Sequence, residues 1–419
     1  MALQHRIRPL RVRLLMLLSI VGPGIITANV DNDAGGITTY SVAGAHFGYS
    51  FLGMMGLVAL ALIIVQEMSA RLGVVTGKGL ADLIRESLGV RATAVIIALV
   101  VFTNLANTVS EFAGVAASLE IFNVSKYISV PLAGVGVWLL IVKGNYKTVE
   151  RIFLAASAIY LAYVISGVLA KPPWPVVLGA LATPTFRFDA PWVVVFVTII
   201  GTTIAPWMQF YQQSSIVDKG LKPADYAYER LDVIAGSIFA VLVATFIVVA
   251  CAATIYKAGL PIETAKDAAV ALRPLAGPYA ATLFALGLLN ASVFSAAILP
   301  LSTAYLVCEA FGWEAGVDRQ LHEAPIFFGT YTALIVLGAA IILLPIKSLV
   351  EAMMASQTLN GVLLPVILIV MLRLINDKRL MGRHANGRIF NIIAWVMVIA
   401  LIILTLILVV TSLFPGLLK

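Results

Sequence analysis

Long apolar runs recur along the chain, separated by short polar segments. A helix needs about 20 apolar residues to cross a hydrocarbon core of roughly 30 Å, and eleven runs come close to that length. The alternating apolar and polar decapeptides typical of outer-membrane barrels are missing. The pattern predicts an all-α integral membrane protein with eleven transmembrane helices, at about 14–46, 50–70, 93–122, 127–142, 150–170, 190–216, 232–256, 275–308, 325–345, 348–374 and 389–414.

Two of these runs contain a segment that disfavours a continuous helix. The first would form a helix of roughly 50 Å, too long for a bilayer, and "DNDAGG" at Asp31–Gly36 is poor helix material in its middle. The sixth contains Gly201 and Pro206, so that helix must bend or break. Broken helices five spans apart point to the binding site of a secondary transporter built from two inverted five-helix repeats. Alternatively, the first helix ends near Val30 and "DNDAGG" forms an external loop.

The composition supports a membrane protein. Hydrophobic residues make up 61% of the chain and charged residues 12%, whereas soluble domains carry about 25% charged residues. The mean hydropathy is +1.01. We expect one transporter domain over residues 1–419, with repeat one at about 12–171, repeat two at about 188–375 and an extra helix at about 389–414. Cys251 and Cys308 lie in apolar runs without metal-ligand spacing, so neither a disulfide nor a zinc site is indicated.

The positive charges are distributed unevenly between the two sides of the predicted membrane domain. With a cytoplasmic N-terminus, 20 of the 28 lysines and arginines fall on the cytoplasmic side. This predicts a multi-pass protein of the plasma or inner membrane with its C-terminus outside. The net charge of +7 is then explained by topology and contact with anionic lipid, and no nucleic-acid partner is expected. The first 24 residues imitate a secretory signal, but we interpret them as part of an uncleaved first helix.

Three carboxylates lie inside predicted spans. Asp31 and Asp33 stand at the first break, and Glu111 stands in the third span within "FTNLANTVSEFAG". An ionisable residue at that depth is a functional hypothesis by default. Together with hydroxyls and freed backbone carbonyls, these groups form an all-oxygen environment that suits hard divalent cations. For Glu111 the alternative is a buried neutral carboxyl, or one near the outer surface that pairs with Lys126.

The segment "VGPGIITANVDNDAGGITTYSVAGAHFGYSFLGMMGLVALALIIVQEMSARLGVVTGKGL" resembles the first two spans of the natural resistance-associated macrophage protein (NRAMP) metal transporters. The resemblance continues through "NTVSEFAG", "IGTTIAPWMQFYQQSS" and "SQTLNG". It implies a leucine-transporter-like fold with two inverted five-helix repeats, broken helices 1 and 6, and usually an eleventh helix. In that family an Asp-Pro-Gly-Asn motif in helix 1 and a methionine in helix 6 bind transition metals.

The metal-binding motif of the family is altered in this chain. The resemblance places the motif aspartate at Asp33, the asparagine at Gly36, the methionine at Ala205 and a carbonyl ligand at Thr202. Losing the thioether removes a bias toward Mn²⁺, Fe²⁺ or Cd²⁺, and the smaller residues leave a wider cavity. Mg²⁺ usually keeps several of its waters, so a roomy acidic pocket suits it. The pattern resembles the NRAMP-related magnesium transporter branch and implies a metal site at Asp33, Glu111, Thr202, Ala205 and Gly36, with Asp31 and Gln357 as weaker candidates.

Gln357 is as well explained by a hydrogen bond between packed helices. The coupling residues of the family also differ: its sixth-helix histidines fall near Trp207 and Gln212, and a third-span acidic residue is replaced by Thr108. Because histidines and carboxylates form the usual proton relays in membranes, we expect transport without tight proton coupling. A gating role and simple packing explain Trp207 equally well.

We therefore predict a transporter that takes up hard divalent cations, Mg²⁺ and also Mn²⁺, with the ion partly hydrated. The transported ion is the expected partner besides the lipid bilayer, no cofactor is expected, and a monomer is the expected state. The alternatives are a proton-coupled Mn²⁺/Fe²⁺ transporter of the general NRAMP type and a sodium-coupled amino-acid symporter of the same fold. A channel would be recognised by its turnover rate. No HExxH or GxSxG motif indicates an enzyme.

Overall fold

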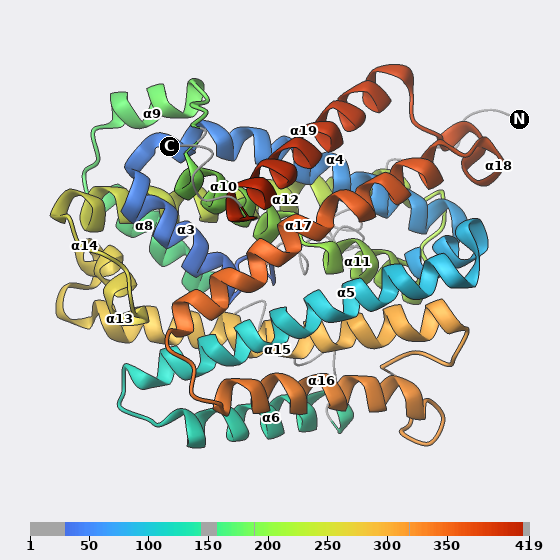
Figure 1. Cartoon of the computed structure of the whole chain (residues 1–419), viewed down its shortest axis with the longest axis horizontal. Coiled ribbons are helices and arrows are strands. Elements are labelled where there is room, and N and C mark those ends of the chain that lie inside the picture. Colours follow the sequence, from blue (N-terminus) through green and yellow to red (C-terminus); the bar gives the residue numbers. More distant parts are fainter. Residues whose placement is uncertain (1–29, 144–156, 188, 318, 414–419) are drawn as a thin grey trace, which may run out of the picture.

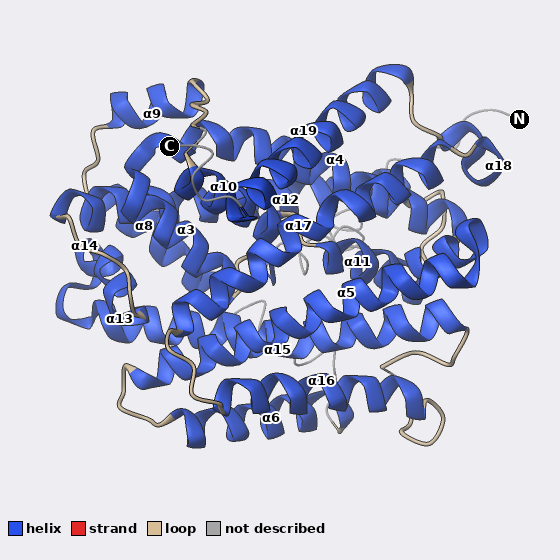
Figure 2. Ribbon diagram, viewed as in Figure 1, coloured by secondary structure: helices blue, strands red, loops and turns tan. Residues whose placement is uncertain are grey.

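The computed structural model describes residues 30–143, 157–187, 189–317 and 319–413. All regular structure in these residues is helical (Figure 2). The longer helices are α3 (Ala34–Phe47), α4 (Leu52–Thr76), α5 (Leu80–Glu120), α6 (Lys126–Val142), α8 (Leu161–Leu169), α9 (Trp174–Ala182), α10 (Ala190–Thr203), α11 (Pro206–Asp218), α12 (Tyr226–Cys251), α15 (Ala280–Phe311), α16 (Pro325–Leu343), α17 (Leu349–Asn376) and α19 (Arg388–Leu413). Three short helices connect them: α13 (Ala265–Ala268), α14 (Arg273–Ala276) and α18 (Lys378–Met381).

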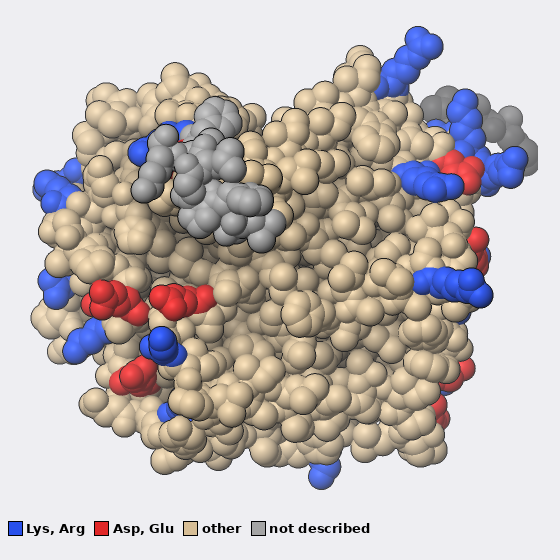
Figure 3. Space-filling model, in the orientation of Figure 1, with Lys and Arg blue, Asp and Glu red and all other residues tan. Residues whose placement is uncertain are grey.

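The helices are long and apolar enough for a membrane domain. Among the described residues, eight helices could cross a bilayer by length and composition, or up to nine if Ala158–Leu169 and Trp174–Ala182, bent by 116°, form one span. In Figure 3 most charged side chains lie toward the two ends of the long axis, with a broad band of other residues between them. The count of eleven spans and the division into repeats stay predictions, and residues 14–29 of the first span lie outside the described residues.

Both predicted breaks occur in the structure. Val30 and Asp31 are helical, Asn32 and Asp33 are not, and α3 begins directly afterwards. All residues from 30 to 45 are buried, so the external-loop interpretation of "DNDAGG" is wrong. In the sixth span α10 ends at Thr203 and α11 begins at Pro206. Pro206 provides the fixed φ that suits the first turn of a helix.

Helices α4 and α5 extend beyond the predicted spans at 50–70 and 93–122. Most of the polar segment 71–92 is helical, because α4 continues to Thr76 and α5 begins at Leu80. Gly89 interrupts α5 with a positive φ of 78°, a conformation that glycine adopts without strain. These polar turns therefore prolong the helices toward one end of the molecule.

Helix α5 lies at the centre of the arrangement, where it packs against α15, α16 and α17 (Figure 1). Helices α6 and α16 form an outer pair along one side. Two glycines allow close approach near the breaks. A Cβ on Gly114 of α5 would lie 2.4 Å from the Ala34 Cβ, and one on Gly201 of α10 would lie 2.0 Å from the Gln357 carbonyl oxygen. These contacts bring α5 and α17 against the two broken helices.

Candidate metal site

Asp33 occupies the N-cap position of α3. Its Oδ1 accepts a hydrogen bond from the Gly36 N–H at 2.6 Å, and its carbonyl accepts one from the Ile37 N–H at 2.9 Å. Aspartate is among the best N-cap residues, because its side chain satisfies a backbone donor that the helix leaves free. The sequence "DAGG" therefore fixes a carboxylate at the start of α3, in the break.

Glu111 on α5 faces the same helix start. Its Oε2 accepts a hydrogen bond from the Ala34 N–H at 3.4 Å, while its Oε1 has no partner within the described residues. Gly114, one turn further along α5, permits this approach because it has no side chain. Lys126 donates to the carbonyls of Ile342 and Leu344, so the pairing of Glu111 with Lys126 is wrong. Glu111 is fully buried.

The end of α10 contributes a backbone carbonyl and a hydroxyl. In a continuous helix the Thr202 carbonyl would accept a hydrogen bond from the N–H of residue 206, but proline has no N–H. The Thr202 Oγ1 is buried without a partner in the described part of the chain. Ala205, the N-cap residue of α11, offers no side-chain donor or acceptor. At the two predicted positions, Thr202 and Ala205, this break therefore offers oxygen atoms and no sulfur ligand.

Gly36 lies where the two breaks meet. A Cβ at this position would lie 2.6 Å from the Asp31 carbonyl oxygen, 3.2 Å from the Thr202 Oγ1 and 3.3 Å from the Asp33 Oδ1. Two oxygen atoms of the first break and one of the second therefore lie around this position, and a side chain here would project among them. The carboxylate oxygens of Asp31 have no hydrogen-bond partner in the described residues, and its charge acts on Asp33 and Tyr40.

Gln357 of α17 completes one side of the site. A Cβ on Gly35 would lie 2.0 Å from its Nε2, and its amide also contacts the Asp33 carboxyl. Its Oε1 accepts from Asn360 at 3.0 Å. Asn360 and Asn107 of α5 exchange two hydrogen bonds of 3.1 and 2.9 Å. Asn360 is not among the residues predicted for the site, although an asparagine one turn from Gln357 in an apolar helix indicates a polar contact.

The site is closed to solvent and rich in negative charge. The candidate side chains Asp31, Asp33, Glu111, Thr202 and Gln357 are each at most 4% exposed. The carbonyl end of α10 adds partial negative charge, whereas the N-terminal ends of α3 and α11 add partial positive charge. Within the described residues, no group of three or more His, Cys, Asp or Glu side chains is placed to hold a metal ion. A cation here must therefore rely on carboxylates mixed with carbonyl, hydroxyl and amide oxygens, or keep part of its water shell.

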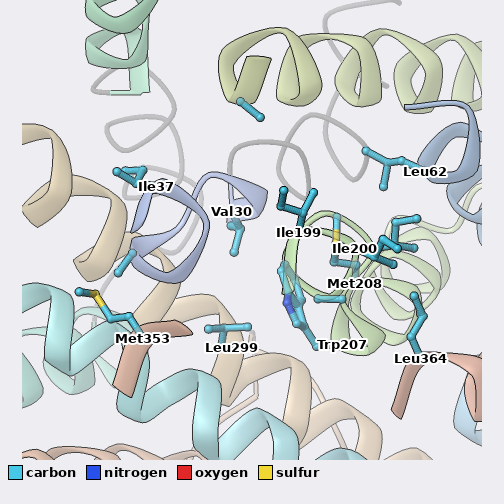
Figure 4. Close-up of a cluster of buried hydrophobic side chains, with 14 of the residues drawn as sticks. Val30, Ile37, Leu62, Ile199, Ile200, Trp207, Met208, Leu299, Met353 and Leu364 are labelled. Atoms are coloured by element: carbon cyan, nitrogen blue, oxygen red, sulfur yellow. The ribbon is translucent and has the colours of Figure 1, made fainter. Parts of the chain in front are cut away.

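The surroundings of the breaks are apolar. Figure 4 shows Trp207 and Met208 at the start of α11 beside Ile199 and Ile200 of α10, and Val30 belongs to the same buried cluster. Trp207 is 2% exposed, and its ring centroid lies 6.3 Å from that of Tyr211. These contacts agree with the packing interpretation of Trp207. Apolar walls exclude bulk water and strengthen the electrostatic interactions inside.

Comparisons with known proteins bear on the family and the fold. The family model described as natural resistance-associated macrophage protein-like matches residues 24–411. The divalent metal cation transporter MntH of Ralstonia nicotianae is 32% identical over 406 residues, covering 90% of this chain and 88% of that protein. The crystal structure of a manganese transporter of Eremococcus coleocola matches with a TM-score of 0.76 at 20% identity, covering 97% of this chain and 88% of that one. Mhp1, a nucleobase-cation-symport-1 family transporter, matches with a TM-score of 0.59 at 16% identity, covering 93% of this chain and 89% of that one.

Proposed function

The chain belongs to the natural resistance-associated macrophage protein-like family and has its all-helical, leucine-transporter-like fold, and from this premise we propose which ions it carries and how. As a member of a divalent metal transporter family, it transports divalent cations across a membrane. We propose that it takes up hard divalent cations, Mg²⁺ and also Mn²⁺, partly hydrated and without tight proton coupling.

The observation that carries this proposal is the geometry around Gly36. Oxygen atoms of Asp31, Asp33 and Thr202 converge on a residue without a side chain, and Ala205 adds no thioether. The Met353 sulfur, one turn from Gln357 on α17, already accepts a hydrogen bond from Thr38 at 3.5 Å. A ligand set of oxygen atoms without a thioether favours a hard cation, and Mg²⁺ is such an ion. The assigned ligands are Asp33, the Thr202 carbonyl and Glu111.

The absence of tight proton coupling is supported by the residues beside the site. Trp207 and Gln212, at the positions of the family's histidines, are buried and do not titrate. The Thr108 hydroxyl donates a hydrogen bond of 2.8 Å to the Asn104 carbonyl. His46, His322 and His384 lie at helix ends or in connections, and His5 lies outside the described residues. An inside-negative potential of about 100 mV is worth about 4.6 kcal/mol for a divalent ion, enough to drive uptake.

The test is uptake of Mg²⁺ and of Mn²⁺ into proteoliposomes under an imposed potential, with internal pH recorded at the same time. We expect both ions to enter at a rate that rises with the potential, while the internal pH stays constant. Acidification in fixed proportion to metal entry would contradict the uncoupled mechanism. Uptake of Mn²⁺ without Mg²⁺ transport or competition would contradict the assignment of a hard-cation site.

A proton-coupled manganese transporter is the second candidate. It is favoured by the name of the Eremococcus coleocola protein, a manganese transporter. In that case internal acidification should accompany Mn²⁺ entry, and Mg²⁺ should neither enter nor compete. The same proteoliposome experiment therefore separates the two candidates.

A further inference from the structure

A second buried acidic group lies between α11 and α12, away from the helix breaks. Glu229 of α12 is fully buried, and Asp232, one turn along the same face, is 4% exposed. Gln212 of α11 is also fully buried, and its amide faces the Glu229 carboxylate. Two carboxylates and an amide therefore lie close together between the end of α11 and the first turns of α12.

The polar atoms of Glu229 and Gln212 are not satisfied by the protein. Neither carboxylate oxygen of Glu229 and neither amide atom of Gln212 makes a full hydrogen bond within the described residues. The exposed Lys219 acts on the charge of Glu229, and Asp232 adds a second negative charge beside it. A buried carboxylate whose oxygens accept no hydrogen bond is costly, and a cation that binds it removes that cost.

The position of this group relative to the first site fits a route for the ion. Helix α11 begins at the second break and runs away from it, so Gln212 lies seven residues, or about 10 Å, beyond Ala205. The connection from α11 to α12 carries Lys219 and Lys222, and Arg230 follows in α12. The charge pattern predicts that this end faces the cytoplasm. The group thus lies between the first site and the predicted cytoplasmic face.

We propose that Glu229, Asp232 and Gln212 form a second divalent-cation site, at which the ion pauses between the helix breaks and the cytoplasmic face. This inference rests on the proposed function. One or two carboxylates with an amide oxygen match the few direct protein ligands that Mg²⁺ takes when it keeps several waters. The site lowers the cost of moving a dication through the inner half of the bilayer.

The first test measures uptake. Glu229→Gln should lower the maximal rate of Mg²⁺ and Mn²⁺ uptake on the order of tenfold, while the half-saturating external concentration, set by the Asp33 site, changes little. Glu314→Gln is the control, since Glu314 is exposed and pairs with Arg319 at 3.3 Å. Glu229→Asp should restore most of the rate. Native-like uptake by Glu229→Gln would overturn the proposal.

The second test measures binding of Mn²⁺ alone to purified full-length protein in detergent. Asp33→Ala should lose the tighter site and retain a weaker one, and Asp33→Ala with Glu229→Gln should retain neither. The second site would be overturned by either of two results: Asp33→Ala binds no Mn²⁺, or the double variant still binds Mn²⁺ at the weaker site. A native protein that binds and transports no divalent ion would instead refute the proposed function. Thermal unfolding of each variant shows whether it is folded, and removing an unpaired buried charge should not lower stability.

Discussion

Replacing Asp33 by asparagine separates the two roles of this residue. The Asp33 side chain caps α3 by accepting a hydrogen bond of 2.6 Å from the Gly36 N–H. Its negative charge is proposed to bind the transported ion. Asparagine caps a helix as well as aspartate does, whereas alanine loses the cap at a cost of about 1 kcal/mol. Asp33→Asn therefore removes the charge and keeps the local structure, while Asp33→Ala removes both.

The size of the effect follows from electrostatics at a buried site. A unit charge about 4 Å from a dication, at an effective dielectric constant of about 20, gains about 8 kcal/mol before desolvation. Desolvation and the remaining carboxylates of Asp31 and Glu111 reduce the net loss. We expect Asp33→Asn to lose at least about 2.8 kcal/mol of ion binding, a factor of about 100.

The assay is initial uptake of Mg²⁺ and of Mn²⁺ into proteoliposomes at concentrations below half-saturation, combined with thermal unfolding without metal. Asp33→Asn should be at least as stable as the native protein, because three buried carboxylates that repel one another become two. The free energy of unfolding of Asp33→Ala should be lower than that of Asp33→Asn by about 1 kcal/mol, because alanine does not cap the helix. Native-like uptake by Asp33→Asn would show that the ion does not bind at the first break.

Three further substitutions test the site and its support. Ala205→Met supplies a soft ligand and should raise the preference for Mn²⁺ over Mg²⁺ by about tenfold, or about 1.4 kcal/mol, in competitive uptake; an unchanged preference would place residue 205 away from the ion. Gly201→Ala puts a Cβ 2.0 Å from the α17 backbone and should cost about 1–3 kcal/mol in thermal unfolding, whereas Gly56→Ala, with open space around it, should not destabilise. The buried Glu67 carboxylate lies 3.0 Å from the Arg71 guanidinium, and Arg71→Ala removes this ion pair. The substitution should lower the free energy of unfolding by about 3–5 kcal/mol, and adding Glu67→Gln should recover part of the loss. Equal stability of the single and double variants would contradict this account.

The breaks could be predicted from the sequence because they depend on local backbone chemistry. Asp-Asn-Asp followed by two glycines disfavours a helix wherever it stands, and Pro206 removes a helical donor in any fold. The prediction for the first break was wider than the observed one. Helix α3 begins at Ala34, because Asp33 caps it and the two glycines remain within its first turn. No cap is among the features predicted for this helix, and the Asp33–Gly36 hydrogen bond comes from the structure.

The meeting of oxygen atoms around Gly36 could not be predicted from spacing alone. Thr202 and Gly36 are brought together by tertiary packing, and the Asn107–Asn360 pair joins residues 253 positions apart. The i, i+4 spacing of Asn107 and Glu111 places them on one side of α5, but spacing does not identify the helix that they face. The family resemblance provided that information for Asp33, Thr202 and Gln357, and the geometry adds Asn360.

The two carboxylates at the site also hold the start of α3, which links ion binding to helix position. The Ala34 N–H donates to Glu111 of α5, and the Gly36 N–H donates to Asp33, which caps α3. The ion therefore attracts one carboxylate that joins α3 to α5 and one that caps α3. A ligand shifts a conformational equilibrium only through a difference in affinity between its states. We therefore infer that Mg²⁺ or Mn²⁺ changes the position of α3 relative to α5. Spin labels at the exposed His46 and Glu120 should show a metal-dependent distance in the native protein and none in Asp33→Asn; equal distances with and without metal in the native protein would refute this coupling.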